Sequence, residues 1–112
     1  MNSPIVAIST CGTLEEAKKI ARGLTESQLA ACVNIVPGII SIYRWKGQVE
    51  EAPEFLLIIK TRSGLMADLQ RKLQELHTYE VPELITLPVT GGLSAYLAWM
   101  GEETSSDSGR LP

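Results

Sequence analysis

The chain has 112 residues, of which 45% are hydrophobic and 21% charged, with a formal net charge of -3. This length and composition indicate one globular domain with its own apolar core. The negative charge argues against nucleic acid as a partner, and no apolar run approaches the roughly 20 residues that cross a bilayer, so we expect no membrane partner.

The start of the chain and its cysteines indicate the compartment. Residues 1–4, Met-Asn-Ser-Pro, lack the charged start and apolar core of a signal peptide, so we expect a cytoplasmic protein. In that compartment Cys11 and Cys32 are expected to be reduced thiols and not a disulfide. Their spacing matches no zinc motif.

A strand and a helix are expected first. Residues 5–11 are short, apolar and followed by a glycine, which predicts a buried strand. Thr13-Leu14-Glu15-Glu16 then has the form of a capping box, in which the threonine hydroxyl accepts from one free amide and Glu16 reaches back to another. The helix that begins there has one apolar face, made of Leu14, Ala17, Ile20, Ala21 and Leu24.

A long hairpin is expected next. Its first arm runs from Ala30 to Lys46 and its second from Gln48 to Thr61, around a tight turn at Lys46-Gly47. We interpret Pro37-Gly38 as a bulge or bend, since proline cannot donate to a sheet and glycine relaxes the backbone. The run 55–59 is apolar at every position, which places the second arm at the centre of the sheet.

The length of this hairpin predicts an oligomer. A strand over residues 30–46 would reach roughly 55 Å at about 3.3 Å per residue, whereas a compact domain of this size is about 35 Å across. The hairpin must therefore bend or project. Tyr43 and Trp45 near its tip would form an exposed apolar edge, which natural proteins seldom leave unpaired. We predict a closed oligomer in which hairpins of different subunits complete one another's sheets.

The second half of the chain repeats the alternation of helix and strand. After Ser63, a predicted N-cap, apolar residues at helical spacing continue to Leu76. A polar stretch with the chain's single histidine follows, then a strand over residues 84–89 and a short helix with one apolar face (Leu93, Tyr96, Leu97, Met100). We expect one domain over residues 1–101 and a disordered tail over residues 102–112, which are rich in serine and charge.

This order of elements predicts an α+β domain. Two interleaved right-handed strand–helix–strand units give the ferredoxin-like split βαβ fold, an antiparallel sheet with both main helices on one face. The first strand and the second helix then end at the same side of the molecule, so Cys11 lies beside residues 77–83. Cys32 begins the second strand at the opposite end and cannot meet Cys11 within one subunit.

Five segments carry a resemblance to a known family. Residues 30–38 read Ala-Ala-Cys-Val-Asn-Ile-Val-Pro-Gly, 41–47 Ser-Ile-Tyr-Arg-Trp-Lys-Gly, 57–61 Leu-Ile-Ile-Lys-Thr, 76–83 Leu-His-Thr-Tyr-Glu-Val-Pro-Glu and 96–99 Tyr-Leu-Ala-Trp. Together they resemble the CutA family, the divalent-cation tolerance proteins. The resemblance spans nearly the whole chain in order. It implies a ferredoxin-like protomer in a homotrimer similar to the PII signalling proteins, a link to copper and other divalent cations, and no established enzyme activity.

The resemblance also implies metal-associated residues. By position these are Cys32 and His77, with Tyr79, Glu80 and Glu83 beside the histidine. Cys11 corresponds to a thiol that follows a threonine in some family members. Relatives often have proline at the position of Thr78, and this difference should change the stiffness of the loop more than its chemistry.

Each of these residues has a structural interpretation beside the functional one. An imidazole near two carboxylates and a thiol suits copper or zinc, but His77 could equally cap the second helix. Glu80 and Glu83 are metal ligands, an acid–base pair, or ion-pair partners of Arg44, Lys46 or Lys60 across a subunit boundary.

The same holds for the first arm of the hairpin. Cys32 lies in an apolar strand, where free cysteine often packs in the core, yet three copies meeting at a trimer axis would form a soft site for Cu(I). Tyr43 and Trp45 are typical of interface anchors rather than of residues that stack on a cofactor.

The sequence therefore supports two functional hypotheses. The first is a cytoplasmic homotrimer that binds copper or another divalent cation weakly at or near subunit boundaries and has no organic cofactor. The second is a PII-like sensor or scaffold whose inter-subunit clefts bind a small anion through Lys60, Arg62 and the Tyr79-Glu80 corner, or bind a partner protein. We expect no enzyme, because no nucleophile with a neighbouring base and no phosphate-binding loop is evident.

Overall fold

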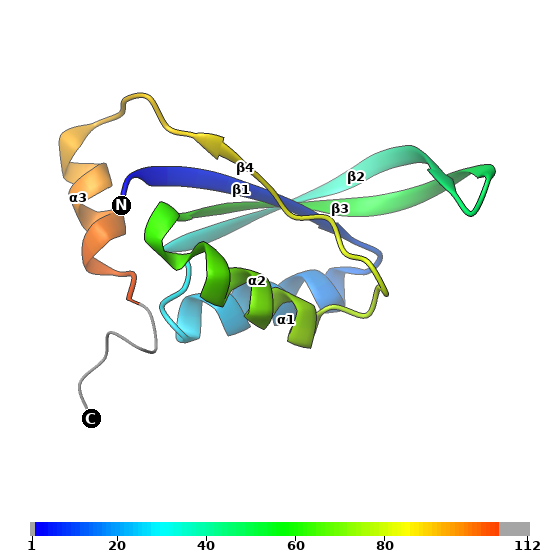
Figure 1. Ribbon diagram of the computed structural model, residues 1–112, viewed down its shortest axis with the longest axis horizontal. Helices are drawn as coiled ribbons and strands as arrows, with labels where there is room; N and C mark the ends of the chain where they lie inside the picture. The colour runs from blue at the N-terminus through cyan, green and yellow to red at the C-terminus, as the bar shows by residue number, and fades with distance from the viewer. Residues whose placement is uncertain (1, 106–112) are drawn as a thin grey trace.

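The structure, a computed structural model, describes residues 2–105. Its elements are β1 (Pro4–Cys11), α1 (Leu14–Glu26), β2 (Cys32–Trp45), β3 (Gln48–Arg62), the 3-10 turn η1 (Ser63–Leu65), α2 (Met66–Leu76), β4 (Ile85–Pro88) and α3 (Ser94–Glu102). The four strands form one antiparallel sheet in the order β2-β3-β1-β4, with α1 and α2 on the same face (Figure 1). The predicted ferredoxin-like arrangement is confirmed.

The start of α1 follows from its capping residue. The backbone of Thr13 is extended, and its hydroxyl accepts from the amide of Glu16 at 3.1 Å, as predicted. The carboxylate of Glu16, expected to reach back to a free amide at the start of the helix, interacts with the backbone of Gly12 and also accepts from the amide and the hydroxyl of Thr78, in the loop after α2. One acidic side chain thus joins the first helix to the polar stretch.

The core lies between the sheet and the two helices. Alternate residues of β1 and β3, such as Ala7 and its partner Ile59, point toward the helices and are fully buried. The helices contribute Ile20, Leu24, Leu69 and Leu73, and burial of each such side chain contributes about 1.5–3 kcal/mol. Gly23 allows α1 and α2 to approach closely, since a Cβ there would lie 2.5 Å from Leu76 Cδ1.

The predicted hairpin projects beyond the body of the molecule (Figure 1), which has principal extents of 45 × 32 × 24 Å. Its turn uses left-handed backbone at Lys46 and Gly47, with φ of 51° and 81°, as a two-residue turn between twisted strands requires. The register shifts between Val36 and Ile39, and Gly38 has a φ of 77°, so the predicted bulge is confirmed.

Four local predictions need correction. The second α-helix begins at Met66, after a 3-10 turn, and not at a cap on Ser63, whose hydroxyl accepts from the amide of Ser3. The last strand covers only residues 85–88 and not 84–89, although the amide of Val89 still donates to the carbonyl of Pro4. The third helix does not bury a whole apolar face, since only Met100 is buried there.

The fourth correction concerns the tail. Glu102 is the last residue of α3, and Thr104 after it is 4% exposed. Arg62 donates to the hydroxyl and the carbonyl of Thr104, both at 2.9 Å, and the amide of Ser105 donates to Gln28. Thr104 and Ser105 are therefore held against the domain, and the rest of the predicted tail, residues 106–112, lies outside the described residues.

Apolar side chains lie on the sheet face opposite α1 and α2, which we call the open face. By register, Ile85 and Leu87 of β4 share this face with Ile8 and Val6 of β1. Ile85 is 54% exposed and Leu87 50% exposed, and Leu93 just before α3 is exposed together with Tyr96 and Trp99 of that helix. The edges of the sheet are β2 and β4, so the described chain leaves both apolar surface and strand edges uncovered.

Candidate functional site

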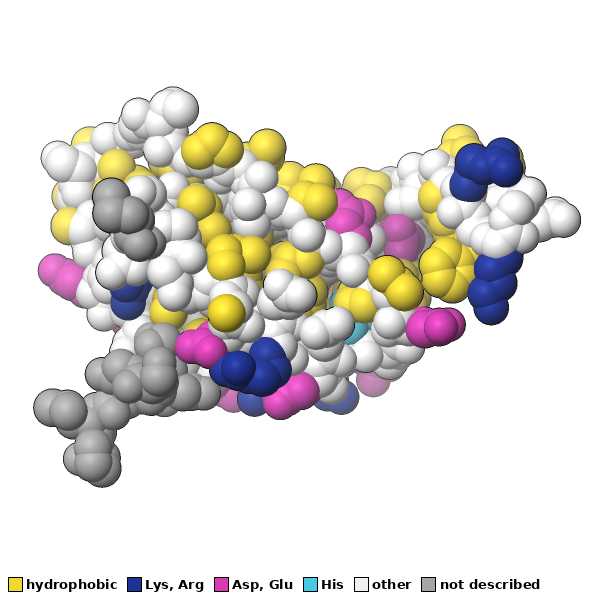
Figure 2. Space-filling model, in the orientation of Figure 1, with side chains coloured by type: hydrophobic (Ala, Val, Ile, Leu, Met, Phe, Trp, Pro, Cys, Tyr) yellow, Lys and Arg dark blue, Asp and Glu magenta, His cyan; other side chains and the backbone are white. Residues whose placement is uncertain are grey.

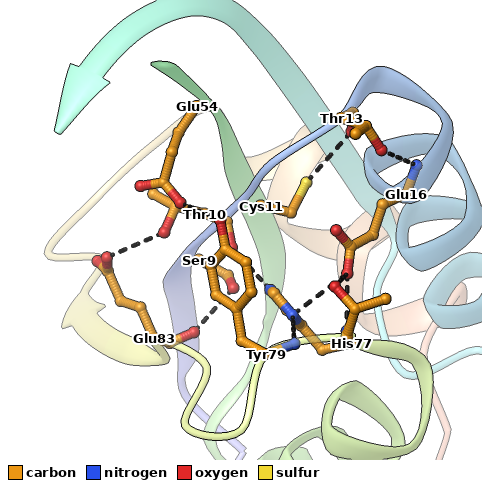
Figure 3. Close-up of polar contacts among 10 residues, drawn as sticks. Ser9, Thr10, Cys11, Thr13, Glu16, Glu54, His77, Tyr79 and Glu83 are labelled. Atoms are coloured by element: carbon orange, nitrogen blue, oxygen red, sulfur yellow. Dashed lines mark hydrogen bonds and ion pairs between the residues drawn. The ribbon is translucent and has the colours of Figure 1, made fainter. Parts of the chain in front are cut away.

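The topology brings several predicted site residues to one end of β1, as expected (Figure 3). The loop after α2 lies against the last residues of that strand. Ser9 donates to the carbonyl of Glu83 at 2.7 Å, and the hydroxyl of Thr10 contacts the Glu83 carboxylate at 3.4 Å. The position of the loop is therefore fixed by the end of a central strand.

His77 anchors this loop from the interior. Its side chain is fully buried, and Nε2 lies 2.7 Å from the carbonyl oxygen of Thr10. A carbonyl only accepts, so Nε2 carries the proton. Nδ1 then accepts from the amide of Tyr79 at 3.1 Å and lies 3.3 Å from Oε2 of Glu16. Because both ring nitrogens have protein partners, a metal ion at His77 would have to displace one of these bonds.

Glu16 holds the same loop from the side of α1. Its Oε2 accepts from the amide and the hydroxyl of Thr78, both at 2.8 Å. Burial of this carboxylate opposes ionisation, but the two hydrogen bonds from Thr78, together with His77 and the backbone of Gly12, hold the pKa of Glu16 below its ordinary value of 4.5. Its position in the first turn of α1 also suits a negative charge.

The two cysteines lie in different environments. Cys11 is completely buried, and burial, followed by the charge of Glu16, raises its pKa to about 11, so its thiol stays protonated at neutral pH. Cys32 is half-buried on the open face, with Sγ 3.9 Å from Nζ of Lys60 and 3.9 Å from Oδ1 of Asn34. Both are free thiols, as predicted.

Register shows how far apart the cysteines are. Cys11 pairs with Phe55 and Cys32 with Lys60, five residues farther along β3, which corresponds to about 17 Å. The prediction that they cannot meet within one subunit is confirmed.

An open cavity of about 600 Å³ lies between the hairpin and the loop after α2. Figure 2 shows this hollow beside the projecting hairpin, with acidic and hydrophobic side chains around it. Residues with predicted roles that line it are Tyr43, Trp45, Tyr79, Glu80 and Glu83. The other lining residues are Thr10, Ser41, Ile42, Glu50, Glu54 and Val81, so four carboxylates and no lysine or arginine surround the cavity.

Glu54 is the most buried of these carboxylates, with 7% of its surface exposed. The phenol of Tyr79 donates to its Oε2 at 2.6 Å. Burial, followed by this hydrogen bond to a carboxylate, raises the pKa of Tyr79, so the phenol keeps its proton and remains a donor. The loop and the hairpin are thus joined by a hydrogen bond at the inner end of the cavity.

The two cations of the anion hypothesis lie elsewhere. Lys60 and Arg62 are near the end of β3, six and eight residues beyond Glu54, or about 20 Å or more away. Lys60 contacts Asn34, and Arg62 is held by Thr104. One protomer does not bring them to the Tyr79-Glu80 corner, and the carboxylates there would repel an anion.

The metal hypothesis also lacks a complete set of ligands within one protomer. Among residues 2–105, no group of three or more His, Cys, Asp or Glu side chains is placed to hold a metal ion. Cys11 and His77 are buried and satisfied, whereas Cys32 and Glu80 are accessible but lie at opposite ends of the sheet.

Sequence reasoning missed three acidic residues of this region. Glu16 was interpreted only as a helix cap, although it holds the loop, and Glu50 and Glu54 were not singled out. The sequence contained a signal that Glu54 would be buried. It stands directly before the apolar run 55–59, in a strand predicted to lie at the centre of the sheet. Such an acid is seldom buried without a reason.

Comparison with known proteins identifies the family. The family described as CutA1 divalent ion tolerance protein matches residues 5–103. The divalent-cation tolerance protein CutA of Thermus thermophilus is 46% identical over 99 residues, which are 88% of this chain and 96% of that protein. The chloroplastic protein CutA of Arabidopsis thaliana is 48% identical over 100 residues, which are 89% of this chain but only 55% of that protein. This chain thus spans little more than half of the plant relative.

Solved structures of CutA proteins have the same fold as this chain. The structure of the divalent cation tolerance protein Cut A1 from Thermus thermophilus superposes with a TM-score of 0.89 at 45% identity, covering 91% of this chain and 99% of that one. A structure described as the periplasmic divalent cation tolerance protein CutA from Archaeoglobus fulgidus has a TM-score of 0.86 at 40% identity, covering 89% and 97%. No helix within residues 2–105 is long and apolar enough to span a membrane. Sequence, fold and the order of the five segments all lead to one conclusion: this chain belongs to the CutA1 divalent ion tolerance protein family.

Proposed function

We propose that this protein is a trimeric divalent-cation tolerance protein that binds copper or another divalent cation weakly, at or near the boundaries between subunits. Its relatives carry the name of that function. The observation that supports this location best is the separation of the candidate ligands. Cys32 and Glu80 are accessible on opposite sides of the protomer, so a site with more than one of these ligands needs a second subunit.

The surface of the protomer supports assembly. Ile85 and Leu87 are about half exposed on the open face, and both edge strands have unpaired backbone groups. A closed ring of subunits would cover this apolar surface and pair the edges, which an isolated domain in water leaves unsatisfied.

Weak binding follows from the ligands themselves. A structural metal site has four ligands in fixed geometry, whereas the described chain offers single accessible donors of different chemistry, a thiol and a carboxylate. The proposal assigns binding and no chemical reaction to these residues. A cytoplasmic location remains our prediction.

Two measurements test the proposal. Sedimentation equilibrium at micromolar concentration is expected to show a trimer, and a monomer would contradict the assembly. Calorimetric titration of ZnCl₂ and CuCl₂ under argon is expected to show binding that Cys32→Ser or Glu80→Gln weakens at least tenfold. Glu51→Gln is the matched control, because Glu51 is an exposed acid of the same hairpin that does not line the cavity. Unchanged binding in the double variant C32S/E80Q would refute the assigned ligands.

A further inference from the structure

Three side chains on the open face meet at the start of β2. Cys32 and Asn34 are alternate residues of this strand, so they project to the same face, and Lys60 is the direct partner of Cys32 on β3. The ammonium of Lys60 donates to Oδ1 of Asn34 and lies 3.9 Å from Sγ of Cys32. Sγ and Oδ1 are themselves 3.9 Å apart. One positive charge thus lies beside both a thiol and an amide oxygen.

The spacing of the two donor atoms fits a metal ion. In tetrahedral coordination, an ion about 2.3 Å from a sulfur and about 2.1 Å from an oxygen holds these two atoms about 3.6 Å apart. The distance of 3.9 Å between Sγ of Cys32 and Oδ1 of Asn34 is close to this value. Thiolate is a soft ligand and amide oxygen a hard one, and zinc-like divalent ions accept both. Asn34 is therefore placed to act as a second ligand beside Cys32.

Lys60 already supplies a cation at this place. Its ammonium contacts both donor atoms, and its side chain is half-buried instead of extending into solvent. A metal ion bound to Sγ of Cys32 and Oδ1 of Asn34 would lie next to the ammonium. Like charges at such short range repel, and screening by salt is weak where the groups are partly buried. The metal ion and the ammonium of Lys60 therefore exclude each other.

We propose that Cys32 and Asn34 form a two-donor cation site which Lys60 occupies in the metal-free protein, so that a metal ion binds there only by displacing the ammonium. This inference rests on the proposed function, which assigns Cys32 as a ligand, and adds to it a second ligand and a competitor. The sulfur binds the ion as a thiolate and its proton passes to solvent, whereas Lys60 keeps its charge and turns away. All three groups belong to one protomer, and the site takes only an ion, so it does not require the open face to be free of a partner subunit.

Titration with CdCl₂ under argon, followed by the ultraviolet absorption of the cadmium–thiolate bond, tests the proposal. Lys60→Met removes the charge but keeps an unbranched side chain, and it is expected to bind Cd²⁺ at least tenfold more tightly than wild type. Lys60→Arg keeps the charge and should bind no more tightly than wild type. Lys72→Met is the matched control, because Lys72 is also half-buried but lies on α2, on the opposite face of the sheet, and should change the affinity less than twofold. In the K60M background, where the competitor is absent, Asn34→Ala should weaken Cd²⁺ binding severalfold.

A second measurement reports the displacement directly. In wild type, the NMR signal of Lys60 Cε should shift when the protein is saturated with Cd²⁺, while that of Lys72 stays unchanged. Equal Cd²⁺ affinities of K60M and K72M, an unmoved Lys60 signal at saturation, or equal affinities of K60M and N34A/K60M would overturn this inference and leave Cys32 as a ligand. If Cys32→Ser bound Cd²⁺ as tightly as wild type, the ligand assigned in the proposed function would be wrong, and this inference with it.

Discussion

Glu16 joins the first turn of α1 to the loop after α2, and its replacement by glutamine tests how strongly this junction stabilises the fold. The carboxylate accepts two hydrogen bonds from Thr78 at 2.8 Å, and Glu16 is 9% exposed. Hydrogen bonds to a charged group contribute about 1.5–3 kcal/mol each, against about 0.5–1.5 kcal/mol for neutral ones. Since glutamine keeps an acceptor but loses the charge, we expect Glu16→Gln to lose about 2 kcal/mol at pH 7.

The loss should depend on pH in a defined direction. The pKa of Glu16 is lower in the folded than in the unfolded protein, so its charge contributes stability above pH 4.5, and this contribution is lost as the pH falls through the folded-state pKa. The difference in free energy of unfolding between wild type and E16Q is therefore expected to be complete at pH 7 and to shrink below pH 4.5.

Urea unfolding at fixed protein concentration measures this difference, because association also contributes to stability in an oligomer. Glu15→Gln is the matched control: Glu15 lies in the same helical turn but is exposed, so only the weak interaction with the helix dipole, about 0.3–1 kcal/mol, is lost. The reasoning would be refuted if E16Q lost no more stability than E15Q at pH 7, or if its deficit stayed constant down to the lowest pH at which the protein folds.

Two further predictions concern packing. Gly23→Ala should destabilise the protein by up to about 2 kcal/mol, because the overpacking of the new Cβ against Leu76, about 1–3 kcal/mol, exceeds the roughly 1 kcal/mol that alanine gains over glycine in a helix. Gly101→Ala in α3, where a Cβ meets nothing within 4 Å, should be neutral or stabilising by up to about 1 kcal/mol. Equal effects in urea unfolding would contradict this account of the contact between the helices. Thr104→Val should cost about 1–2 kcal/mol and speed amide exchange in the last turn of α3, since Arg62 loses its hydroxyl acceptor; unchanged exchange rates would show that this contact does not hold the helix end.

Several features of the fold were predictable because their causes are local. A threonine hydroxyl can reach the amide three residues on whatever surrounds it, so Thr13 marked the start of α1. Gly47 suits left-handed backbone, and Pro37-Gly38 disrupts a ladder, so the hairpin turn and the bulge followed from single residues. The handedness of crossovers then left few ways to connect the strands.

Features that depend on distant contacts were not predictable in the same way. Ser63 has the chemistry of an N-cap, yet the α-helix begins three residues later. The tail looked too polar to pack, but Thr104 meets Arg62, a residue 42 positions earlier in the chain. Composition describes a segment alone and says nothing of a partner that only the fold supplies.

For the candidate site, the sequence by itself determined which chemical groups are present and, through topology, that Cys11 and residues 77–83 lie at one end of the sheet while Cys32 lies at the other. Only the tertiary structure decided the burial, hydrogen bonding and protonation of these groups. It buries His77 and uses both of its nitrogens, keeps Cys11 protonated, and buries Glu54 at an acidic cavity, where the phenol of Tyr79 donates to it. Burial and hydrogen bonding set the availability and charge of a side chain, and both arise from residues far apart in the sequence.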